Sequence, residues 1–319
     1  MKRVFLPLTV VVAACGSGAS SSTSTAAPTG ASSAIETVLR EELDRGGADL
    51  NADYAVAIVL DATTGAALAV EGRDHGRSDP TIATQHSVVT GSTLKPILYA
   101  AAFDAGTIDP SASVDCAPRQ YPGGTFHDAS PHGVLSLTDA LAVSSNVGAS
   151  RVFDTLGLSR WYAAVKRFHI GDAPAALPVV TEATPGAAAA FAAGELAKAT
   201  PMQMAKAYVA LFHEGLYPGA PDERVIKSET AAIVVKMLEA TVASDIGTGK
   251  SARIEGARVA GKTGTGDLEN GGHYASFIGT VLDREPHVVI LVGYEGSHEG
   301  MMGSSVAGVF AKIARRTLR

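Results

Sequence analysis

Strand-like runs lie near both ends of this 319-residue chain, and the long stretch between them is helix-rich. Residues 54–60 and 66–71 are two such runs, and Thr63-Thr64-Gly65 between them is typical of a hairpin turn. Three more runs follow near the end, at residues 258–264, 274–282 and 288–292. Strands so far apart in sequence bury their apolar faces most simply in one sheet. We therefore predict a mixed α/β (α+β) fold, with an antiparallel sheet of about five strands, a separate all-helical lobe, and a cleft between them.

Amphipathic helices are expected at both ends of the domain and in its middle. Ser33 and Glu36 form a capping box, and apolar residues follow them at helical spacing. Thr200 followed by Pro201 is a typical helix start in the middle region. The apolar spacing in residues 306–316 predicts a last helix. The two terminal helices are expected to flank the sheet.

The first 32 residues differ in composition from the rest. A short basic start precedes an apolar run at residues 4–14, which is too short to span a bilayer but suits the core of a signal peptide. The run ends in Val-Ala-Ala before Cys15, which resembles a bacterial lipobox. We expect residues 1–14 to be a lipoprotein signal peptide, Cys15 to carry lipid, and residues 15–32 to be a flexible tether. An ordinary signal peptide cut near the same site is the alternative.

This reading of the amino terminus also predicts a location. The folded domain is expected over residues 33–319, exported and anchored to a bacterial membrane through lipid on Cys15. It would face the periplasm or another extracytoplasmic space.

The composition excludes several classes of protein. With 46% apolar and 18% charged residues, the chain is not disordered, and a formal net charge of −6 argues against a nucleic-acid-binding protein. If Cys15 is lipidated, Cys116 has no partner for a disulfide and is expected to be a buried thiol. The nine histidines lack metal-ligand spacing such as H-E-x-x-H, and no Gly-rich phosphate loop occurs. We expect neither metal nor cofactor.

The segment Gly91-Ser92-Thr93-Leu94-Lys95-Pro96 contains the pattern S-x-x-K at the start of an apolar helix. That spacing places Lys95 one turn beyond Ser92 on the same face. A serine hydroxyl needs an adjacent base to become a nucleophile, and lysine can be that base only when it is neutral, as burial or a nearby cation can make it. Taken alone, the pattern is more often part of a solvated helix face.

Two further patterns follow in order. Ser144-Ser145-Asn146 is an S-x-N pattern between two apolar helical runs, where by itself it is more simply a helix N-cap. Lys262-Thr263-Gly264-Thr265 is a K-T-G pattern on a predicted strand. Its glycine would leave room for a ligand against the strand, and its lysine and threonines offer donors to a carboxylate. By itself it is more simply a strand end.

Together the three patterns form a recognised signature of serine acyl transfer. Further matching segments are Val147 after the S-x-N pattern, residues 200–205 and Gly247-Thr248-Gly249. On these residues and motifs, the chain resembles the penicillin-binding protein transpeptidase domain over residues 35–318. The resemblance implies an active-site cleft between sheet and lobe. It also implies peptidoglycan stem peptides ending in D-Ala-D-Ala as substrates, and covalent binding of β-lactam antibiotics.

The resemblance implies a role for each motif. Ser92 would be the acylated nucleophile, and Lys95 would be the base that takes its proton. Ser144 and Asn146 would relay that proton to the leaving group and hold the backbone of the substrate. Lys262 would supply positive potential.

The remaining implied roles concern binding of the substrate. The K-T-G segment would hold the terminal carboxylate, with Thr263, Gly264 and Thr265 as the binding residues. The backbone N–H groups of Ser92 and Thr265 would form the oxyanion hole.

The chain also departs from the family. Thr90 stands where members usually have a proline, and the tether leads almost directly into the domain. We therefore expect a stand-alone lipoprotein, and a D,D-transpeptidase or a D-Ala-D-Ala carboxypeptidase are both open. Protein partners and oligomeric state are not predicted.

Two other functions remain as alternatives. A class A β-lactamase would need a glutamate in an E-x-x-L-N pattern; the chain lacks it, and Glu182 in the corresponding region is more simply a solvated loop residue. Ser145-Asn146-Val147 matches the S-x-V pattern of class D β-lactamases only in a shifted register. A penicillin-binding sensor that is acylated without turnover is the second alternative.

Overall fold

The computed structural model describes residues 30–122, 124–297 and 300–318. The predicted signal peptide, Cys15 and nearly all of the predicted tether lie outside these residues. The first helix, α1 (Gly30–Leu50), begins three residues before the expected start at Ser33, so the end of the predicted tether lies within it.

One antiparallel sheet is built from both ends of the domain, as predicted. Its strands lie in the order β12 (Val259–Asp267), β13 (His273–Val281), β14 (Val288–Gly296), β1 (Tyr54–Asp61), β2 (Ala67–Asp74) and β3 (Arg77–Ser78). The five long strands match the predicted number, and β3 adds a two-residue edge. Strand β14 pairs with β13 and β1, and its side chains enter an apolar core on each face of the sheet, which explains its continuous apolar sequence.

The predicted hairpin turn connects β1 and β2. The Asp61 carboxylate accepts hydrogen bonds from the backbone N–H groups of Thr63 and Thr64 and from the Thr64 hydroxyl. Gly65 follows with a φ of +66°. The polar residues of the turn thus satisfy its backbone groups and allow the two strands to pair from Tyr54 onward.

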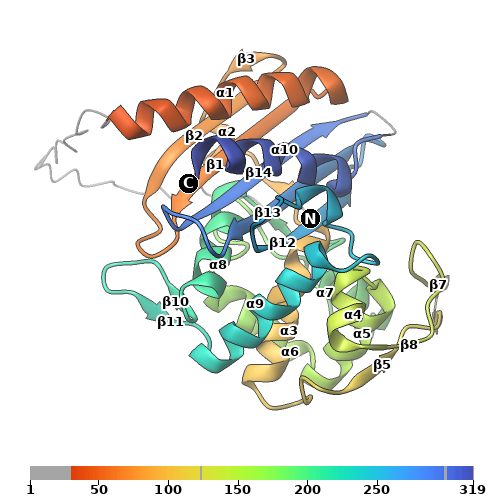
Figure 1. The fold of residues 1–319 in the computed structure, drawn as a ribbon. Helices are drawn as coiled ribbons and strands as arrows, with labels where there is room; N and C mark the ends of the chain where they lie inside the picture. Colours follow the sequence, from red (N-terminus) through yellow and green to blue (C-terminus); the bar gives the residue numbers. More distant parts are fainter. Residues whose placement is uncertain (1–29, 123, 298–299, 319) are drawn as a thin grey trace, which may run out of the picture.

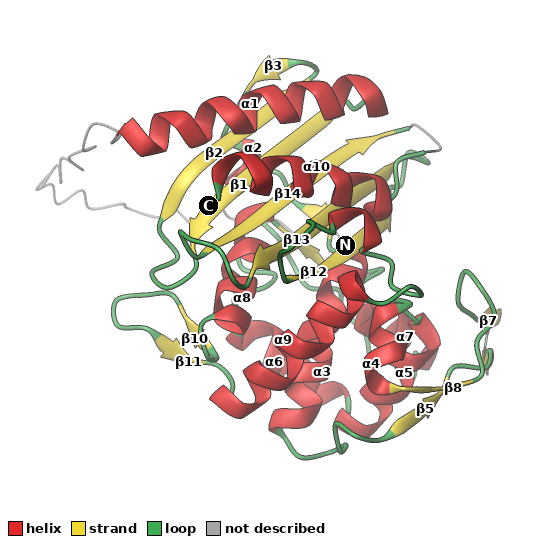
Figure 2. Cartoon of the chain, viewed as in Figure 1, coloured by secondary structure: helices red, strands yellow, loops and turns green. Residues whose placement is uncertain are grey.

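Helices cover both faces of the sheet (Figures 1 and 2). On one face α1 and α10 (Gly303–Thr317) bury apolar residues against the strands, and Tyr294, Phe277 and Phe310 lie in that layer. On the other face the main core continues from the sheet into the helical lobe. The sheet therefore lies between two apolar layers, and the second of them continues into the core of the lobe.

The lobe is helix-rich rather than all-helical. Its helices, in chain order, are α3 (Lys95–Asp104), α4 (Leu137–Ala142), α5 (Asn146–Leu156), α6 (Leu158–Arg167), α7 (Pro185–Ala193), α8 (Pro201–Phe212) and α9 (Ser228–Ala243). Short strand pairs accompany these helices: β4 (Val88–Val89) with β9 (Lys198–Ala199), β5 (Ser113–Asp115) with β8 (Val134–Ser136), β6 (Arg119–Tyr121) with β7 (Gly124–Phe126), and β10 (Leu216–Tyr217) with β11 (Glu223–Arg224). Two-residue and three-residue strands leave little periodicity in a sequence, so the predicted all-helical lobe omitted them.

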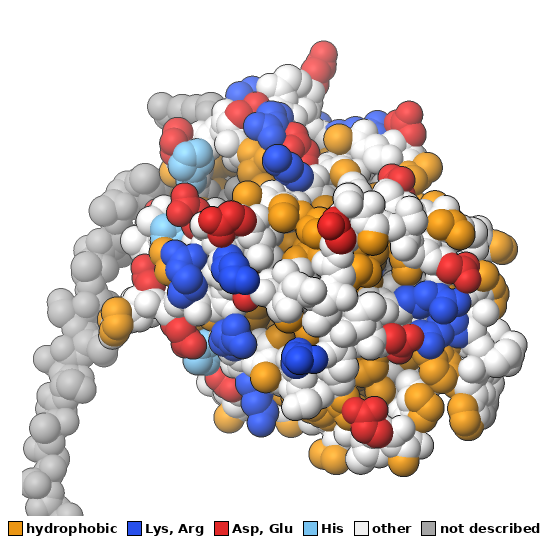
Figure 3. All heavy atoms as spheres, turned by 90° about the horizontal axis from the view of Figure 1, so that it is seen from below, with side chains coloured by type: hydrophobic (Ala, Val, Ile, Leu, Met, Phe, Trp, Pro, Cys, Tyr) orange, Lys and Arg blue, Asp and Glu red, His pale blue; other side chains and the backbone are white. Residues whose placement is uncertain are grey.

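Three short helical segments complete the chain: α2 (Ile82–Gln85), the 3₁₀ turn η1 (Gly91–Leu94) and the 3₁₀ turn η2 (Lys250–Ala252). Helix α8 begins at the predicted cap, Thr200, and the cap is a full capping box: the Thr200 hydroxyl accepts from Gln203 N, and the Gln203 side chain accepts from Thr200 N. On the underside of the molecule, acidic and basic side chains lie close to one another (Figure 3). Among the described residues, no helix combines the length and the apolar character that crossing a membrane requires.

Candidate active site

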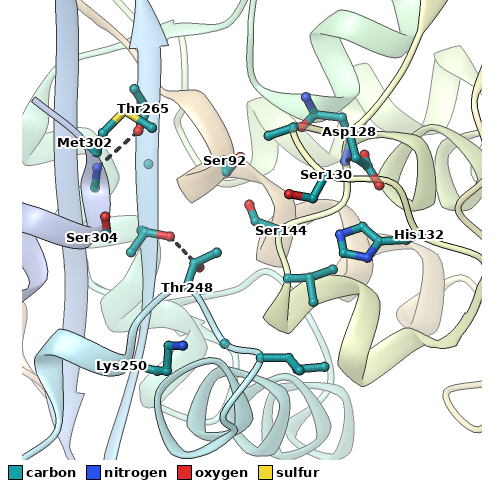
Figure 4. A pocket seen from close by; sticks show the side chains of 18 of the residues that line it. Ser92, Asp128, Ser130, His132, Ser144, Thr248, Lys250, Thr265, Met302 and Ser304 are labelled. Carbon is teal, nitrogen blue, oxygen red and sulfur yellow. Dashed lines mark hydrogen bonds between the residues drawn. The ribbon is translucent and has the colours of Figure 1, made fainter. Parts of the chain in front are cut away.

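A cavity of about 680 Å³ lies where β12 faces the helical lobe. Thr265, Met302 and Ser304 lie on one side of it and Asp128, Ser130 and His132 on the other, with Ser92 and Ser144 between them (Figure 4). Six of the residues predicted from the motifs line the cavity: Ser92, Ser144, Asn146, Thr263, Gly264 and Thr265. The two predicted lysines, Lys95 and Lys262, are buried next to them. The structure thus brings together three motifs that are separated by up to 170 residues.

Close backbone packing fixes the turn that carries Ser92. This residue lies in η1, and the backbone N–H of Lys95 donates to the Ser92 carbonyl, which closes the turn. Gly91 has a φ of +53°, and a Cβ there would lie 2.5 Å from the carbonyl oxygen of Thr265. Only glycine therefore lets the turn approach β12 so closely. The Tyr208 hydroxyl donates to the Thr93 carbonyl at 2.8 Å and ties the same turn to α8.

The Lys95 amine is fully buried and reaches the S-x-N motif. Its Nζ donates to the Ser144 carbonyl at 2.6 Å and to Asn146 Oδ1 at 2.5 Å, and it lies 3.4 Å from Ser144 Oγ. Burial lowers the pKa of Lys95 to about 8, although the charges of Asp128 and Glu195 act in the opposite direction. About a tenth of Lys95 is then neutral at pH 7, which meets the condition for a lysine base.

The S-x-N segment combines a helix cap with two residues that face the cavity. Ser145 is the N-cap of α5, because its hydroxyl accepts from the backbone N–H of Gly148 at 2.8 Å. The simpler interpretation of this motif as a cap is therefore correct for its middle residue. Ser144 has a φ of +64°, and both Ser144 and Asn146 line the cavity. The cap thus presents its two neighbours to the site.

Asp128 fixes this segment from a loop that the sequence analysis did not single out. Its Oδ1 accepts from the backbone N–H groups of Asn146 and Val147 at 2.6 and 2.9 Å, and its Oδ2 accepts from the Ser145 hydroxyl at 2.6 Å. A carboxylate at the N-terminus of a helix satisfies free N–H groups and is favoured by the helix dipole. No local pattern indicates this role, since Asp128 precedes the helix it caps by 18 residues.

The second buried lysine belongs to β12. Lys262 Nζ donates to Ser144 Oγ at 2.9 Å and to the Thr263 hydroxyl at 3.3 Å. Burial, reinforced by the nearby charge of Lys95, holds the pKa of Lys262 well below its usual value. Ser144 Oγ therefore lies between two buried amines, which is a geometry suited to passing a proton.

The K-T-G strand is fixed by neighbours on both sides. The hydroxyls of Thr263 and Thr248 are 2.7 Å apart, and Thr265 Oγ1 accepts from the backbone N–H of Gly303 at 3.1 Å. A Cβ on Gly264 would lie 2.8 Å from Thr93 Cγ2. The glycine therefore allows η1, the turn that carries Ser92, to pack against the strand, in addition to the predicted room for a ligand.

Glu195 is another residue near the motifs that no pattern identified. Its Oε1 accepts a hydrogen bond from Asn146 Nδ2 at 2.9 Å, on the opposite side of that amide from Lys95. One side of the residue is open to solvent. Desolvation on the other side raises the pKa of Glu195, against the charge of Lys95.

Other residues considered from the sequence lie elsewhere. Glu182 is exposed and does not line the cavity, as expected of a solvated loop residue. Cys116 is a free and buried thiol, and burial raises its pKa. Among the described residues, no group of three or more His, Cys, Asp or Glu side chains is arranged to hold a metal ion.

The sheet, the helix-rich lobe and the three motifs between them form the arrangement expected of a penicillin-binding protein transpeptidase domain. The comparison with protein families agrees. The family model of the penicillin binding protein transpeptidase domain matches residues 55–315. The chain belongs to this family.

Curated relatives are similar over most of the chain. The probable peptidoglycan D,D-transpeptidase PenA of Neisseria gonorrhoeae is 28% identical over 88% of this chain and 54% of its own length. The peptidoglycan D,D-transpeptidase FtsI of Escherichia coli is 28% identical over 72% of this chain and 44% of its own. The chain thus spans about half the length of the curated relatives it matches.

Solved structures are similar over a larger share of their chains. The transpeptidase domain of penicillin-binding protein 3 from Burkholderia pseudomallei has a TM-score of 0.80 and 25% identity, covering 89% of this chain and 93% of that one. Penicillin-binding protein 3 from Mycobacterium tuberculosis in complex with aztreonam has a TM-score of 0.78 and 26% identity, covering 88% and 76%. The predicted fold is therefore confirmed.

Proposed function

We propose that this protein is a serine D,D-transpeptidase that acts on peptidoglycan stem peptides ending in D-Ala-D-Ala, through an acyl group on Ser92. The observation that carries the proposal is the buried Lys95 amine. It lies one turn after Ser92 and is bonded to the S-x-N motif. Burial of an amine is costly unless its neutral form is used, and acyl transfer uses that form.

In the acylation step, neutral Lys95 takes the proton of Ser92 as Oγ attacks the carbonyl carbon of the penultimate D-Ala. The carbonyl oxygen becomes an oxyanion that the backbone N–H groups of Ser92 and Thr265 would stabilise. Each such donor contributes roughly 10²- to 10³-fold in rate. The proton then passes through Ser144, which contacts both lysines, to the amine of the leaving D-Ala.

The wall formed by β12 suits the terminal carboxylate of the substrate. Thr263 and Thr265 offer hydroxyls, and Thr248 positions the Thr263 hydroxyl. Lys262 lies beneath them and would add positive potential in its protonated form, which a bound carboxylate favours. A β-lactam presents the same two features, an acyl carbon and a carboxylate. We therefore expect β-lactams to acylate Ser92 covalently.

Transfer of the acyl group to an amine acceptor completes the transpeptidase reaction. The names of PenA and FtsI favour this outcome over hydrolysis. Hydrolysis would make the protein a carboxypeptidase or a β-lactamase, and lasting acylation without turnover would make it a sensor. Glu182, the residue that the sequence offered as a candidate base for a β-lactamase, is exposed and does not line the cavity, which supports acyl transfer over that alternative.

The substrate also supports the predicted location. Peptidoglycan lies outside the cytoplasm, so the proposed activity requires export, and lipid on Cys15 would hold the domain at a membrane surface. Mass spectrometry of the protein from a bacterial host would show a diacylglyceryl group on Cys15, and a Cys15→Ala variant would lack it.

The first experiment is to acylate the purified protein with benzylpenicillin and to follow loss of the adduct by mass spectrometry. An adduct on Ser92 that lasts minutes to hours, together with cross-linked product from a D-Ala-D-Ala peptide and an amine acceptor, supports the transpeptidase. Release of D-Ala without cross-linking supports a carboxypeptidase, and loss of the adduct within a second supports a β-lactamase. A lasting adduct with no product from the peptide supports a sensor. Ser92→Ala should abolish the adduct, while Ser130→Ala, which removes another hydroxyl from the cavity wall, should retain it.

A further inference from the structure

Glu195 belongs to a segment that packs directly against the nucleophile turn. Strand β9 pairs with β4, and the backbone N–H of Thr90 donates to the Ala197 carbonyl at 2.9 Å. The backbone N–H of Gly91 donates to the Gly194 carbonyl at 3.1 Å. The residues on both sides of Glu195 are thus bonded to residues just before Ser92, and its position is fixed relative to the site.

The contacts of Asn146 define one orientation for its amide. The Lys95 amine donates hydrogen bonds, so Oδ1 of Asn146 must face it. The Nδ2 group then points at Glu195, whose carboxylate can accept. If Glu195 offered no acceptor, Asn146 would lose the hydrogen bond that distinguishes the nitrogen of its amide from the oxygen.

We propose that Glu195 is a positioning residue for acyl transfer: its carboxylate holds the Asn146 amide with Oδ1 on Lys95, and its negative charge favours the ammonium form of Lys95. The residue thereby sets the pH at which the base becomes neutral. The inference rests on the proposed acylation of Ser92, and it goes beyond that function by assigning a role to a residue outside the three motifs.

The charges around Lys95 determine in which direction its pKa should move when Glu195 is changed. Asp128 and Glu195 both favour protonated Lys95, while burial opposes it, and Lys262 lies against the same Ser144 hydroxyl. Glu195 in turn is influenced by Lys95, Asp267 and His127. Asp128 also caps α5, so changing it alters structure and charge together. Glu195 is therefore the better residue to change, because it does not cap a helix and its charge can be removed separately.

Glu195→Gln removes the charge but retains an oxygen that can accept from Asn146 Nδ2. With one fewer negative charge near it, Lys95 should lose its proton more easily. We expect the acid limb of the acylation rate, measured with a fluorescent penicillin on the full chain, to move about 0.5–1 pH unit lower. Acylation at pH 7 should then be about 2.5- to 5-fold faster than in the wild type, because the neutral fraction of Lys95 rises by that factor.

Two further variants separate charge from geometry. Glu195→Leu removes the acceptor as well, so it should show the same shift of the acid limb with a lower maximal rate. Glu182→Gln removes a charge from an exposed loop residue away from the cavity and should leave the profile unchanged. Thermal melts of all variants should agree with the wild type, because Glu195 has one face in solvent.

A second measurement does not depend on acylation. The ¹⁵N resonance of the Lys95 side chain, assigned by its loss in Lys95→Ala, reports the protonation of this amine directly. Its titration midpoint should lie lower in Glu195→Gln than in the wild type. If the wild type is not labelled by penicillin, the proposed function is wrong, and this titration still tests the role of Glu195.

The proposal is overturned if the acid limb and the Lys95 titration of Glu195→Gln both coincide with those of the wild type. It is also overturned if the acylation profile is unchanged and only the lifetime of the acyl-enzyme increases. Glu195 would then act on the hydrolytic water instead of on Lys95.

Discussion

The backbone N–H of Gly91 donates a hydrogen bond to the carbonyl oxygen of Gly194 at 3.1 Å. Both glycines have positive φ, +53° at Gly91 and +91° at Gly194, and a Cβ on Gly194 would overlap with the Gly91 carbonyl group. Gly91, the residue before Ser92, therefore packs against the loop that contains Gly194 through backbone atoms alone. The position of Ser92 depends on the lack of a side chain at both places.

Gly194→Ala should displace the nucleophile turn. The new methyl group meets backbone that cannot rotate away, so either η1 or the loop that contains Gly194 must shift. We expect acylation by penicillin to slow at least tenfold, since a shift of about 1 Å in a reacting group costs that much or more. Stopped-flow labelling would measure the rate.

Gly256→Ala is the matched control for this variant. Gly256 also has a positive φ, +68°, but no atom lies within 4 Å of the position of its Cβ. It should lose stability from backbone strain alone, about 1 kcal/mol, with no change in acylation rate. Equal acylation rates in the two variants would contradict the role assigned to the Gly91–Gly194 contact.

Asp128→Asn should weaken both the fold and the site. An amide cannot accept hydrogen bonds on both of its terminal atoms, so the Ser145 hydroxyl or the N–H groups of α5 lose part of their bonding. Loss of a cap of this kind costs about 1–2 kcal/mol in the free energy of unfolding. Acylation should also slow, because Ser144 and Asn146 are held by the same bonds.

Asp109→Asn serves as the comparison. Asp109 accepts from the backbone N–H and the hydroxyl of Ser111 in an exposed turn outside the cavity. Its removal should change stability by less than about 0.5–1 kcal/mol and leave the acylation rate unchanged. If Asp128→Asn behaved in the same way, the carboxylate would not be what holds the S-x-N segment. Urea denaturation and the labelling rate together decide this.

The sequence predicted the three motifs because their chemistry is local. Ser92 and Lys95 lie one turn apart, and the spacing of Ser144 and Asn146 follows from a helix cap at Ser145. The sheet was predictable for a similar reason, since long strands such as β14 carry a continuous apolar signal.

Asp128 and Glu195 could not be found in this way. Each acts through a contact across 18 or 49 residues of chain, and nothing near either residue marks it. The short strand pairs of the lobe were missed because a two-residue strand has no period. What the sequence lacked was the tertiary packing that brings isolated polar residues to the ends of helices and to buried amides.

Lys95→Met should abolish acylation and change how stability depends on pH. The native pKa of Lys95 is lowered to about 8 from an ordinary value near 10.5, so the unfolded chain binds more protons between these two values. The contribution of Lys95 to stability is therefore full above about pH 10.5 and is lost as the pH falls through 8. Methionine has no proton to bind and lacks this dependence.

The difference in unfolding free energy between wild type and Lys95→Met isolates this contribution. It should move in favour of the wild type by roughly 2 kcal/mol from pH 7 to pH 10, as measured by urea denaturation. Lys236→Met, which removes a lysine from an exposed position of α9, is the control for the loss of a surface amine. A flat difference for Lys95→Met would show that the buried amine keeps its ordinary pKa.

Arg316→Met should loosen α1 from α10. Glu42 is buried, and its carboxylate accepts from Arg316 at 2.7 Å and from Arg45 at 2.6 Å. Burial opposes the charge, but these hydrogen bonds hold the pKa of Glu42 below its usual 4.5. Glu42 thus stabilises the fold fully above about pH 4.5, and this contribution is lost as the pH falls through the lower native value. Because Arg316 is partly exposed and Arg45 remains, removal of Arg316 should cost about 1–2 kcal/mol at pH 7.

Below pH 4.5, the free energy of unfolding of Arg316→Met should fall less than that of the wild type, because the variant has already lost this contact. Amide hydrogen exchange in α1 should be faster in the variant. Arg315→Met provides the control, because the exposed Arg315 is adjacent on α10 and donates to the Arg253 carbonyl rather than to α1. It should change stability by about 0.5 kcal/mol or less and leave exchange in α1 as it was.

The start of α10 also contacts the K-T-G strand, because the backbone N–H of Gly303 donates to Thr265. If Arg316→Met also slows acylation, the packing of α10 against α1 affects that strand. If Arg316→Met matched Arg315→Met in both stability and exchange, the ion pairs of Glu42 would not be what holds α1 to the domain.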